Sequence, residues 1–116
     1  MFEGHDTTSA NITWSLHLLG CNIEIQEKVY DEIIRVCGYS SEITQDDLSK
    51  LKYTECCLKE SLRLYPSAPI ISRRLGIDTK MGEHVVPAGS QVLINIFLIH
   101  RDPAFWPDPE VFNPDR

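Results

Sequence analysis

Near the start of the chain an acidic side chain and a hydroxyl side chain are adjacent, at Asp6 and Thr7, just after Gly4. A helix here would be weak, because glycine costs about 1 kcal/mol relative to alanine and short hydroxyl side chains compete for backbone hydrogen bonds. One interpretation is a helix beside a ligand, in which Gly4 opens space and Asp6 with Thr7 forms a proton-donor pair. The other is a loop, capped by Asp6 or Thr7, that leads into a helix over residues 9–19. Composition favours neither.

A second pair of charged residues, Glu60 and Arg63, lies in the stretch before the first proline. Residues three apart are neighbours on one face of a helix. Cys56 and Leu64 flank the pair on its own side. The opposite side is apolar, with Leu58, Leu62 and Tyr65. Because buried charges persist only when they are paired and hydrogen-bonded, the pattern predicts a buried helix with an internal ion pair. The alternative is an ordinary surface pair, which an isolated E-x-x-R usually is.

The sequence predicts no metal site made by its own cysteines and histidines. The four cysteines have no C-x-x-C spacing, and two of them are adjacent, so they are better interpreted as reduced, small apolar side chains. These cysteines are Cys21, Cys37, Cys56 and Cys57. His5, His17 and His84 also lack ligand spacing.

Length and composition set limits on these sites. A chain of 116 residues is at most one domain, and its 42% hydrophobic content is typical of globular proteins. No stretch of about 18 apolar residues could cross a membrane. The net charge of −6, with scattered lysines and arginines, argues against a nucleic-acid partner.

The first half of the chain has the pattern of packed helices. Two are expected beside the Glu60 helix, over residues 23–37 and 45–51. Asn22 is a suitable N-cap for the first of these, and Gly38 is suited to end it. The charged residues of that helix are interpreted as a solvated face. Thr44 and Asp47 resemble a capping box at the start of the second.

The second half changes character, because all seven prolines lie between Pro66 and Pro114. Strands are expected over residues 70–77 and 91–94, with a turn-bounded segment over 80–86 between them. A helical turn over 96–100 precedes a meander, which would be anchored by Phe105, Trp106 and Phe112. The predicted fold class is mainly α with a small β region, helical over residues 1–65 and built of strands and meander over 66–116.

Three separated stretches resemble one family, in the family's order. Residues 2–9, FEGHDTTS, resemble the distal-helix oxygen-binding motif of cytochromes P-450. Residues 59–63, KESLR, are similar to the E-x-x-R helix of that family, and residues 112–116, FNPDR, to its F-x-P-E-R-F meander. The form F-E-G-H-D-T-T most resembles the fatty-acid omega-hydroxylases. The resemblance covers essentially the whole chain.

The resemblance implies roles for the first motif. Asp6 and Thr7 match the acid–alcohol pair that relays protons during dioxygen cleavage, and are the predicted catalytic residues. Gly4 matches the position where the helix opens to admit oxygen. Glu3 matches a glutamate that can form an ester to a haem methyl group, although a solvated first-turn carboxylate is the alternative.

It also implies a scaffold. Glu60, Arg63 and Arg116 match a structural ion-pair triad, in which one buried carboxylate serves two guanidinium groups. Arg73 matches the arginine that contacts a haem propionate. Pro69, Ile70 and Ile71 match the segment that lines the substrate pocket. His100 is interpreted as a packing or propionate-side residue and not as an iron ligand.

For the whole chain, the resemblance implies an internal part of a larger protein: a partial cytochrome P-450 fold and not a complete domain. The family's iron ligand is a cysteine in a loop of the form F-x-x-G-x-x-x-C-x-G, and we expect it beyond Arg116. The implied function is a haem-dependent monooxygenase that inserts one oxygen atom of O2 into an apolar substrate, with a fatty-acyl chain as one candidate.

The implied cofactor is haem (iron protoporphyrin IX), and the implied electron donor is an NADPH-dependent reductase. The implied location is the cytoplasmic face of the endoplasmic reticulum membrane. The alternative is that this chain alone is a catalytically inactive truncated fragment or a helical interaction module.

Overall fold

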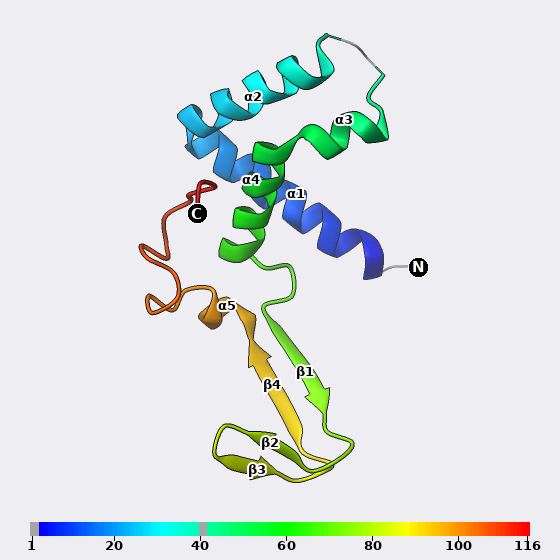
Figure 1. Cartoon of the computed structure of the whole chain (residues 1–116), viewed down its shortest axis with the longest axis vertical. Helices are drawn as coiled ribbons and strands as arrows, with labels where there is room; N and C mark the ends of the chain where they lie inside the picture. The colour runs from blue at the N-terminus through cyan, green and yellow to red at the C-terminus, as the bar shows by residue number, and fades with distance from the viewer. Residues whose placement is uncertain (1–2, 40–41) are drawn as a thin grey trace.

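The computed structural model describes residues 3–39 and 42–116. A helical body stands at one end of an elongated molecule, and a β arm extends from it, with overall dimensions of 57 × 37 × 23 Å (Figure 1). The helices are α1 (Glu3–Cys21), α2 (Ile23–Cys37), α3 (Gln45–Lys50), α4 (Lys52–Leu64) and α5 (Ile96–Ile99). The strands are β1 (Ile70–Arg74), β2 (Thr79–Met81), β3 (His84–Val86) and β4 (Gln91–Asn95). The predicted class, mainly α with a small β region, is confirmed.

α1 is continuous from Glu3 to Cys21, so the interpretation of its first turns as a loop is wrong. Hydroxyl side chains along the helix donate hydrogen bonds back to its own carbonyl groups, for example from Thr8 to the Gly4 carbonyl at 3.3 Å and from Thr13 to the Ser9 carbonyl at 2.8 Å. These bonds satisfy the hydroxyl groups within the helix, so the short polar side chains do not interrupt it. None of the described helices is long and apolar enough to cross a membrane.

The predicted boundaries of α2 are confirmed, but the predicted cap at its start is wrong. Gly38 closes the helix with a positive φ of 64°, a conformation that glycine adopts without strain. The Asn22 side chain makes no cap hydrogen bond to α2. It donates instead to the Leu18 carbonyl at 2.8 Å, so it satisfies the end of α1.

α3 begins with the predicted capping box. The Thr44 side chain accepts from the Asp47 backbone N–H at 3.2 Å, and the Thr44 backbone N–H donates to the Asp47 carboxylate at 3.1 Å. Two otherwise unpaired donors are satisfied by this exchange. The helix ends at Lys50, one residue earlier than expected.

The core of the helical body joins α1, α2, α4 and the C-terminal segment. Its buried apolar residues are Leu18, Val29, Cys57, Leu64 and Phe112. α4 does not bury the face that the sequence suggested, because Leu58 and Leu62 are 41% and 38% exposed. Its buried residues are Cys57, Glu60, Ser61, Arg63 and Leu64, so the charged pair lies on the inner face.

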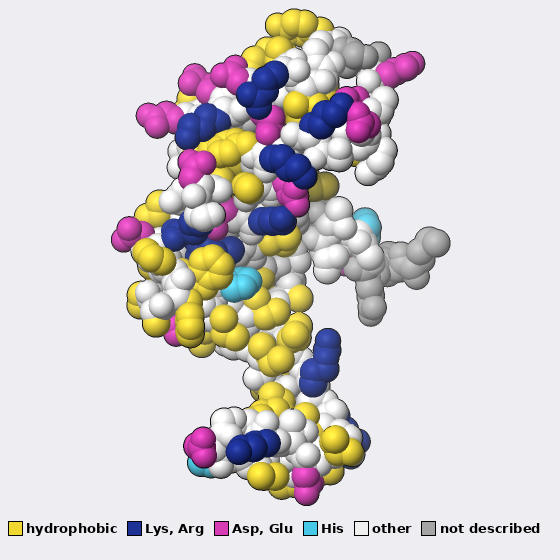
Figure 2. Space-filling model, in the orientation of Figure 1, with side chains coloured by type: hydrophobic (Ala, Val, Ile, Leu, Met, Phe, Trp, Pro, Cys, Tyr) yellow, Lys and Arg dark blue, Asp and Glu magenta, His cyan; other side chains and the backbone are white. Residues whose placement is uncertain are grey.

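The β arm is made of two antiparallel pairs, β1 with β4 and β2 with β3. β1 stops at Arg74, three residues before the expected end, and β4 extends to Asn95. The segment expected over residues 80–86 is a hairpin of two strands, whose turn contains Gly82 at a φ of 61°. Figure 2 shows that the arm is narrow between the helical body and its β2–β3 end.

The meander after α5 is held by two of its three expected aromatic anchors. Phe112 is 7% exposed and belongs to the core. Trp106 lies under the Arg63 guanidinium, 5.2 Å from its ring centroid, and meets the His100 ring edge-on. Phe105 is 73% exposed, so its prediction as an anchor is wrong. A proline-rich segment without strand pairing relies on such side-chain contacts.

Candidate functional site

Glu60 lies at the centre of a buried hydrogen-bond network. Arg63 donates to both carboxylate oxygens, from Nε to Oε2 at 2.8 Å and from Nη2 to Oε1 at 2.9 Å. Arg116 Nε donates to Oε1 at 3.0 Å, and the Asn113 backbone N–H donates to the same oxygen at 3.1 Å. Glu60 and Arg63 are 6% and 3% exposed. One carboxylate therefore binds two guanidinium groups, and the structure brings together the three residues that the motif comparison grouped.

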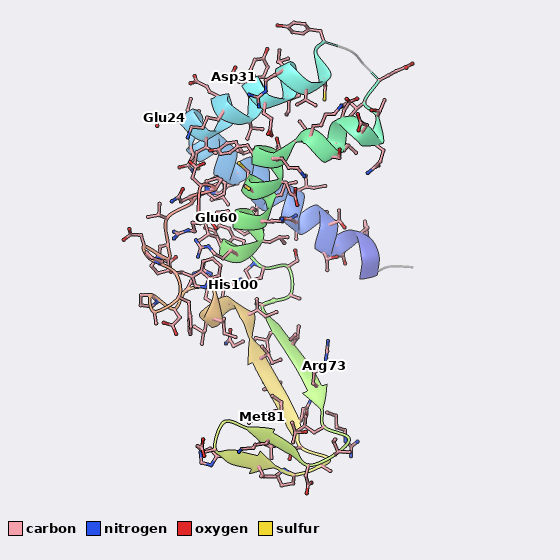
Figure 3. All side chains as sticks on the ribbon, viewed as in Figure 1. Glu24, Asp31, Glu60, Arg73, Met81 and His100 are labelled. Atoms are coloured by element: carbon pink, nitrogen blue, oxygen red, sulfur yellow. The ribbon has the colours of Figure 1, made fainter. Side chains whose placement is uncertain are left out.

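Arg63 also ties α4 to the meander. Its Nη1 donates to the carbonyl groups of His100 and Pro109, each at 2.7 Å, and its Nη2 donates to the Val111 carbonyl at 3.2 Å. A planar guanidinium can satisfy several acceptors at fixed angles, which a lysine ammonium cannot. The helix and the meander are thus joined through one buried side chain. Figure 3 shows Glu60 and His100 near one another at this junction.

Arg116 completes the network from the C-terminal side. Its side chain is 16% exposed and donates to the carbonyl groups of Pro107, Asp108 and Val111 in addition to Glu60. Asp108 has a positive φ of 49°, which is uncommon for a residue other than glycine. The carbonyl groups of the meander thus converge on Arg116, in addition to the side-chain contacts of Trp106 and Phe112.

The electrostatics of Glu60 suit a scaffold. Burial would raise the pKa of this carboxyl group, but the hydrogen bonds from Arg63, the Asn113 backbone and Arg116 outweigh it and hold the pKa below its ordinary value of 4.5. The carboxylate is ionised at neutral pH, and four hydrogen bonds are directed at its oxygens. It is therefore unsuited to proton transfer. The structural role of the triad stays a prediction that this geometry supports.

The sequence interpretation missed a second buried carboxylate, Glu32, which is 6% exposed. It accepts from the backbone N–H groups of Tyr53 and Thr54, each at 2.8 Å, and from the Thr54 hydroxyl at 2.8 Å. Burial raises the pKa of Glu32, but together the three hydrogen bonds lower it by more than burial raises it, so the net shift is downward. Glu32, which lies on α2, thus caps the first turn of α4. Its position three residues after the buried Val29 was an available signal.

Thr7 lines an open hollow of about 450 Å³ between α1 and the segment that follows α4. Thr8, Asn11 and His100 also line it, as do residues 66–68. The Ser67 hydroxyl donates to the Thr7 backbone carbonyl at 2.9 Å, across the edge of this hollow. The buried Nδ1 atom of His100 has no hydrogen-bond partner among the described residues. The hollow thus combines an apolar wall with several polar groups on its rim.

The other residues of the first motif lie at the start of α1. The Asp6 carboxylate is exposed and lies 3.5 Å from His5 Nδ1. The space around Gly4 is open, since a methyl group added there would meet no other described atom within 4 Å. Close packing therefore does not require glycine at this position. The Glu3 side chain lies outside the described part of the structure.

The predicted substrate and propionate residues lie on or beside β1. Ile70 and Ile71 pair with Asn95 and Ile94 of β4, and the Pro69 carbonyl accepts from the Phe97 N–H at 3.2 Å. Ile71 is half-buried, whereas Pro69 and Ile70 are exposed.

Arg73 is exposed on β1, away from Glu60 and His100 (Figure 3), and donates to the Ser72 carbonyl at 2.9 Å. Within the described residues, the structure brings Thr7 to the residue 66–68 segment but does not bring Arg73 to the hollow.

The described residues offer no cluster of metal ligands. No group of three or more His, Cys, Asp or Glu side chains in the described ranges could hold a metal ion. Burial raises the pKa of the Cys57 thiol to about 11, with smaller contributions from neighbouring groups, so it stays protonated. Cys21 and Cys56 are exposed, and neither lines the hollow.

Comparisons with known proteins assign the family. The family pattern described as "Cytochrome P450" matches residues 1–116. The chain belongs to the cytochrome P-450 family. It is 50% identical over 118 residues to "Cytochrome P450 4c3" of Drosophila melanogaster, 50% identical over 117 residues to "Cytochrome P450 4V2" of Mus musculus, and 42% identical over 117 residues to "Cytochrome P450 4A10" of Rattus norvegicus. These alignments cover 100% of this chain and 22%, 22% and 23% of the relatives.

The fold agrees with solved cytochrome P-450 structures. A zebra fish cytochrome P-450 structure with progesterone matches with a TM-score of 0.90 and 35% sequence identity, over 97% of this chain and 27% of that one. The family resemblance inferred from three short motifs is therefore confirmed, as is the expectation of a partial cytochrome P-450 fold. The chain spans about a fifth of the length of the curated relatives that it matches.

Proposed function

We propose that the protein containing this chain is a haem-dependent monooxygenase that inserts one oxygen atom of O2 into an apolar, fatty-acyl substrate. The observation that carries the proposal is the match of all 116 residues to the cytochrome P-450 family, at up to 50% identity to relatives named as members 4c3 and 4V2. The placement of Thr7 on the rim of a hollow supports it.

Haem, when bound, supplies the chemistry of dioxygen activation. The residues of this chain that would hold it are Arg73, as the partner of a propionate, and Glu3, as the candidate for an ester link. The space beside Gly4 would remain open to oxygen. The Glu60, Arg63 and Arg116 network would hold the surrounding elements in place and would not touch the reacting atoms.

Asp6 and Thr7 would move protons. The Asp6 side chain is exposed to solvent, and the Thr7 hydroxyl would donate into the hollow that its residue lines. A hydroxyl group beside a carboxyl group can therefore act as the last donor of a relay. Loss of the hydroxyl would let reducing equivalents leave as peroxide in place of product.

The substrate would lie against an apolar wall formed by Pro69, Ile70 and Ile71. These side chains offer no charge and no hydrogen-bond donor, so an acyl chain would gain from leaving water there. The electrons would come from an NADPH-dependent reductase. The site of action would be the cytoplasmic face of the endoplasmic reticulum membrane.

The test is to express the full-length protein, reduce it and expose it to carbon monoxide. A thiolate-ligated haem should give its characteristic reduced carbon-monoxide absorption band, and NADPH with a reductase should yield a hydroxylated fatty acid. Absence of that band from a folded, haem-loaded protein would refute the proposal. Hydroxylation of a different apolar compound in place of fatty acids would refute only the substrate class.

A second candidate is that the 116-residue chain acts without haem as a helical interaction module. The large exposed side chains Leu16, Tyr30 and Tyr39 on and beside the helices favour it. A cooperative thermal unfolding transition of the isolated, haem-free chain would support this candidate. An unfolded isolated chain would refute it, and this is the outcome expected if the helices need the rest of the protein to bury their faces.

A further inference from the structure

The first half of α1 receives a hydrogen bond from a distant part of the chain. Ser67 Oγ donates to the carbonyl oxygen of Thr7 at 2.9 Å, and the two residues are 60 positions apart in the sequence. Ser67 is half-buried and lines the same hollow as Thr7. The bond therefore joins the helix that carries the proton-donor pair to the linker between α4 and β1.

The donor side of this bond is held firmly. Ser67 lies between Pro66 and Pro69, whose rings restrict the backbone φ angle to about −65°. Before this segment, the Tyr65 N–H bonds to the Ser61 carbonyl at 2.8 Å. After it, the Pro69 carbonyl accepts from Phe97. A short linker anchored at both ends presents the Ser67 hydroxyl at a nearly fixed position.

The acceptor side is weak by itself. The turn around Thr7 contains glycine, aspartate, threonine and serine, all of which are poorer helix formers than alanine. Ser9 Oγ donates to the Asp6 carbonyl at 3.0 Å, one of several such back-bonds in α1. Short stretches of this composition hold a helical position mainly through tertiary contacts. The contact with Ser67 is therefore significant for where the Thr7 side chain lies.

We propose that Ser67 is a positioning residue that holds the Asp6–Thr7 pair at a fixed place relative to the substrate wall. The proposed substrate wall begins at Pro69, two residues after Ser67, so one short segment would contact both the Thr7 backbone and the substrate. This inference rests on the proposed monooxygenase function. Small displacements of a catalytic group away from its productive geometry lower the rate strongly, which gives the bond a functional consequence.

The test uses Ser67→Ala in the full-length protein, with two readouts. The first is amide hydrogen exchange over residues 7–11, which should become about two- to tenfold faster, as expected for the loss of one ordinary hydrogen bond. The second is the ratio of peroxide to hydroxylated product, which should rise several-fold. Substrate affinity, measured separately, should stay within about twofold, because the apolar wall is retained.

Two variants serve as controls. Ser67→Thr keeps the hydroxyl group and should restore both readouts. Ser49→Ala removes a hydroxyl that donates to the Asp46 carbonyl at 2.7 Å in α3, and should change neither. Both variants and Ser67→Ala should take up haem to the same extent as the wild-type protein, so a general folding defect would be visible.

The outcomes separate this inference from the function on which it rests. A wild-type protein that makes product, together with a Ser67→Ala variant that matches it in exchange and in peroxide ratio, would overturn the inference alone. Faster exchange without extra peroxide would also overturn it, because the bond would then be only structural. A wild-type protein that lacks the thiolate-haem band would overturn the proposed function and the positioning role together.

Discussion

Two carboxylates in this molecule have opposite surroundings. In the Glu60 network, meaning Glu60, Arg63 and Arg116, the first two residues are buried. The Glu60 carboxylate accepts four hydrogen bonds, three from these arginines and one from the Asn113 backbone. The Thr7 turn, meaning residues 4–9 of α1, is exposed over most of its length, with the Asp6 carboxylate 78% exposed. The first carboxylate is held by hydrogen bonds that lower its pKa, whereas the second is open to solvent. Burial and pairing, and not residue type, distinguish the surroundings of these two carboxylates.

Among the variants that test this contrast, Glu60→Ala in the full-length protein should have the largest effect on the free energy of unfolding. Removing one partner leaves Arg63 as an uncompensated buried charge, so unfolding should be favoured by about 3–5 kcal/mol. We expect failure to fold or to take up haem, measured by urea unfolding and by haem content. Glu83→Ala, at an exposed position, is the matched control and should have little effect. A stable, haem-loaded Glu60→Ala protein would contradict a structural role for the Glu60 carboxylate.

Neutralising the Glu60 carboxylate by lowering the pH should have the next largest effect on the free energy of unfolding. The pKa of Glu60 is lowered in the folded state, so its contribution to stability is present above the ordinary value of 4.5 and is lost as the pH falls through the lower folded value. The free energy of unfolding should therefore decrease below pH 4.5. The stability difference between wild type and Glu60→Gln should narrow over the same range. A difference that stays constant in acid would contradict the assignment.

Glu32→Ala should have an intermediate effect. It leaves the N–H groups of Tyr53 and Thr54 without their acceptor at the start of α4, at a cost of about 1–3 kcal/mol. The measurement is urea unfolding of the full-length protein. Glu27→Ala, an exposed change on the same helix, should fall within about 0.5 kcal/mol of wild type. Equal effects of the two variants would show that Glu32 is not a cap.

Thr7→Ala should have the smallest effect on stability and a clear effect on chemistry. Because Thr7 is exposed in α1, the change in unfolding free energy should be within about 0.5 kcal/mol. The fraction of reducing equivalents that ends as peroxide should rise, because the hydroxyl donor is lost. Tight coupling in this variant would argue against a relay. Serine at the same position retains the hydroxyl and should preserve coupling.

Local patterns were read correctly from the sequence where one rule decided them. The Thr44–Asp47 box and the closure of α2 by Gly38 depend on residues close together in the chain. Distant contacts were not readable. Leu58 and Leu62 match an inward apolar stripe, yet the meander packs on the face that contains Arg63 and leaves these leucines partly exposed. One local pattern also failed: Asn22 looks like a cap for α2, but its side chain donates to the Leu18 carbonyl, four residues earlier in the chain.

The same limit applies to the site. The motif order grouped Glu60 with Arg63 and Arg116, because the family pattern contains distant residues that spacing alone does not connect. For Glu32 the sequence offered only its place three residues after Val29, and for Ser67 it offered no signal, because their partners lie 21 and 60 residues away. Single buried carboxylates and single hydroxyls are common, and only coordinates show which backbone groups they meet.

The Glu60 network also sets an order of events during synthesis on the ribosome. Arg63 follows Glu60 by three residues, so this pair can form as soon as the helix does. Arg116 follows by 56 residues, and at about 5–20 residues per second it leaves the ribosome about 3 to 11 seconds later. During that interval the helix carries a carboxylate with part of its hydrogen-bonding capacity unused. All four hydrogen bonds to the Glu60 carboxylate can therefore be present only after Arg116 has emerged.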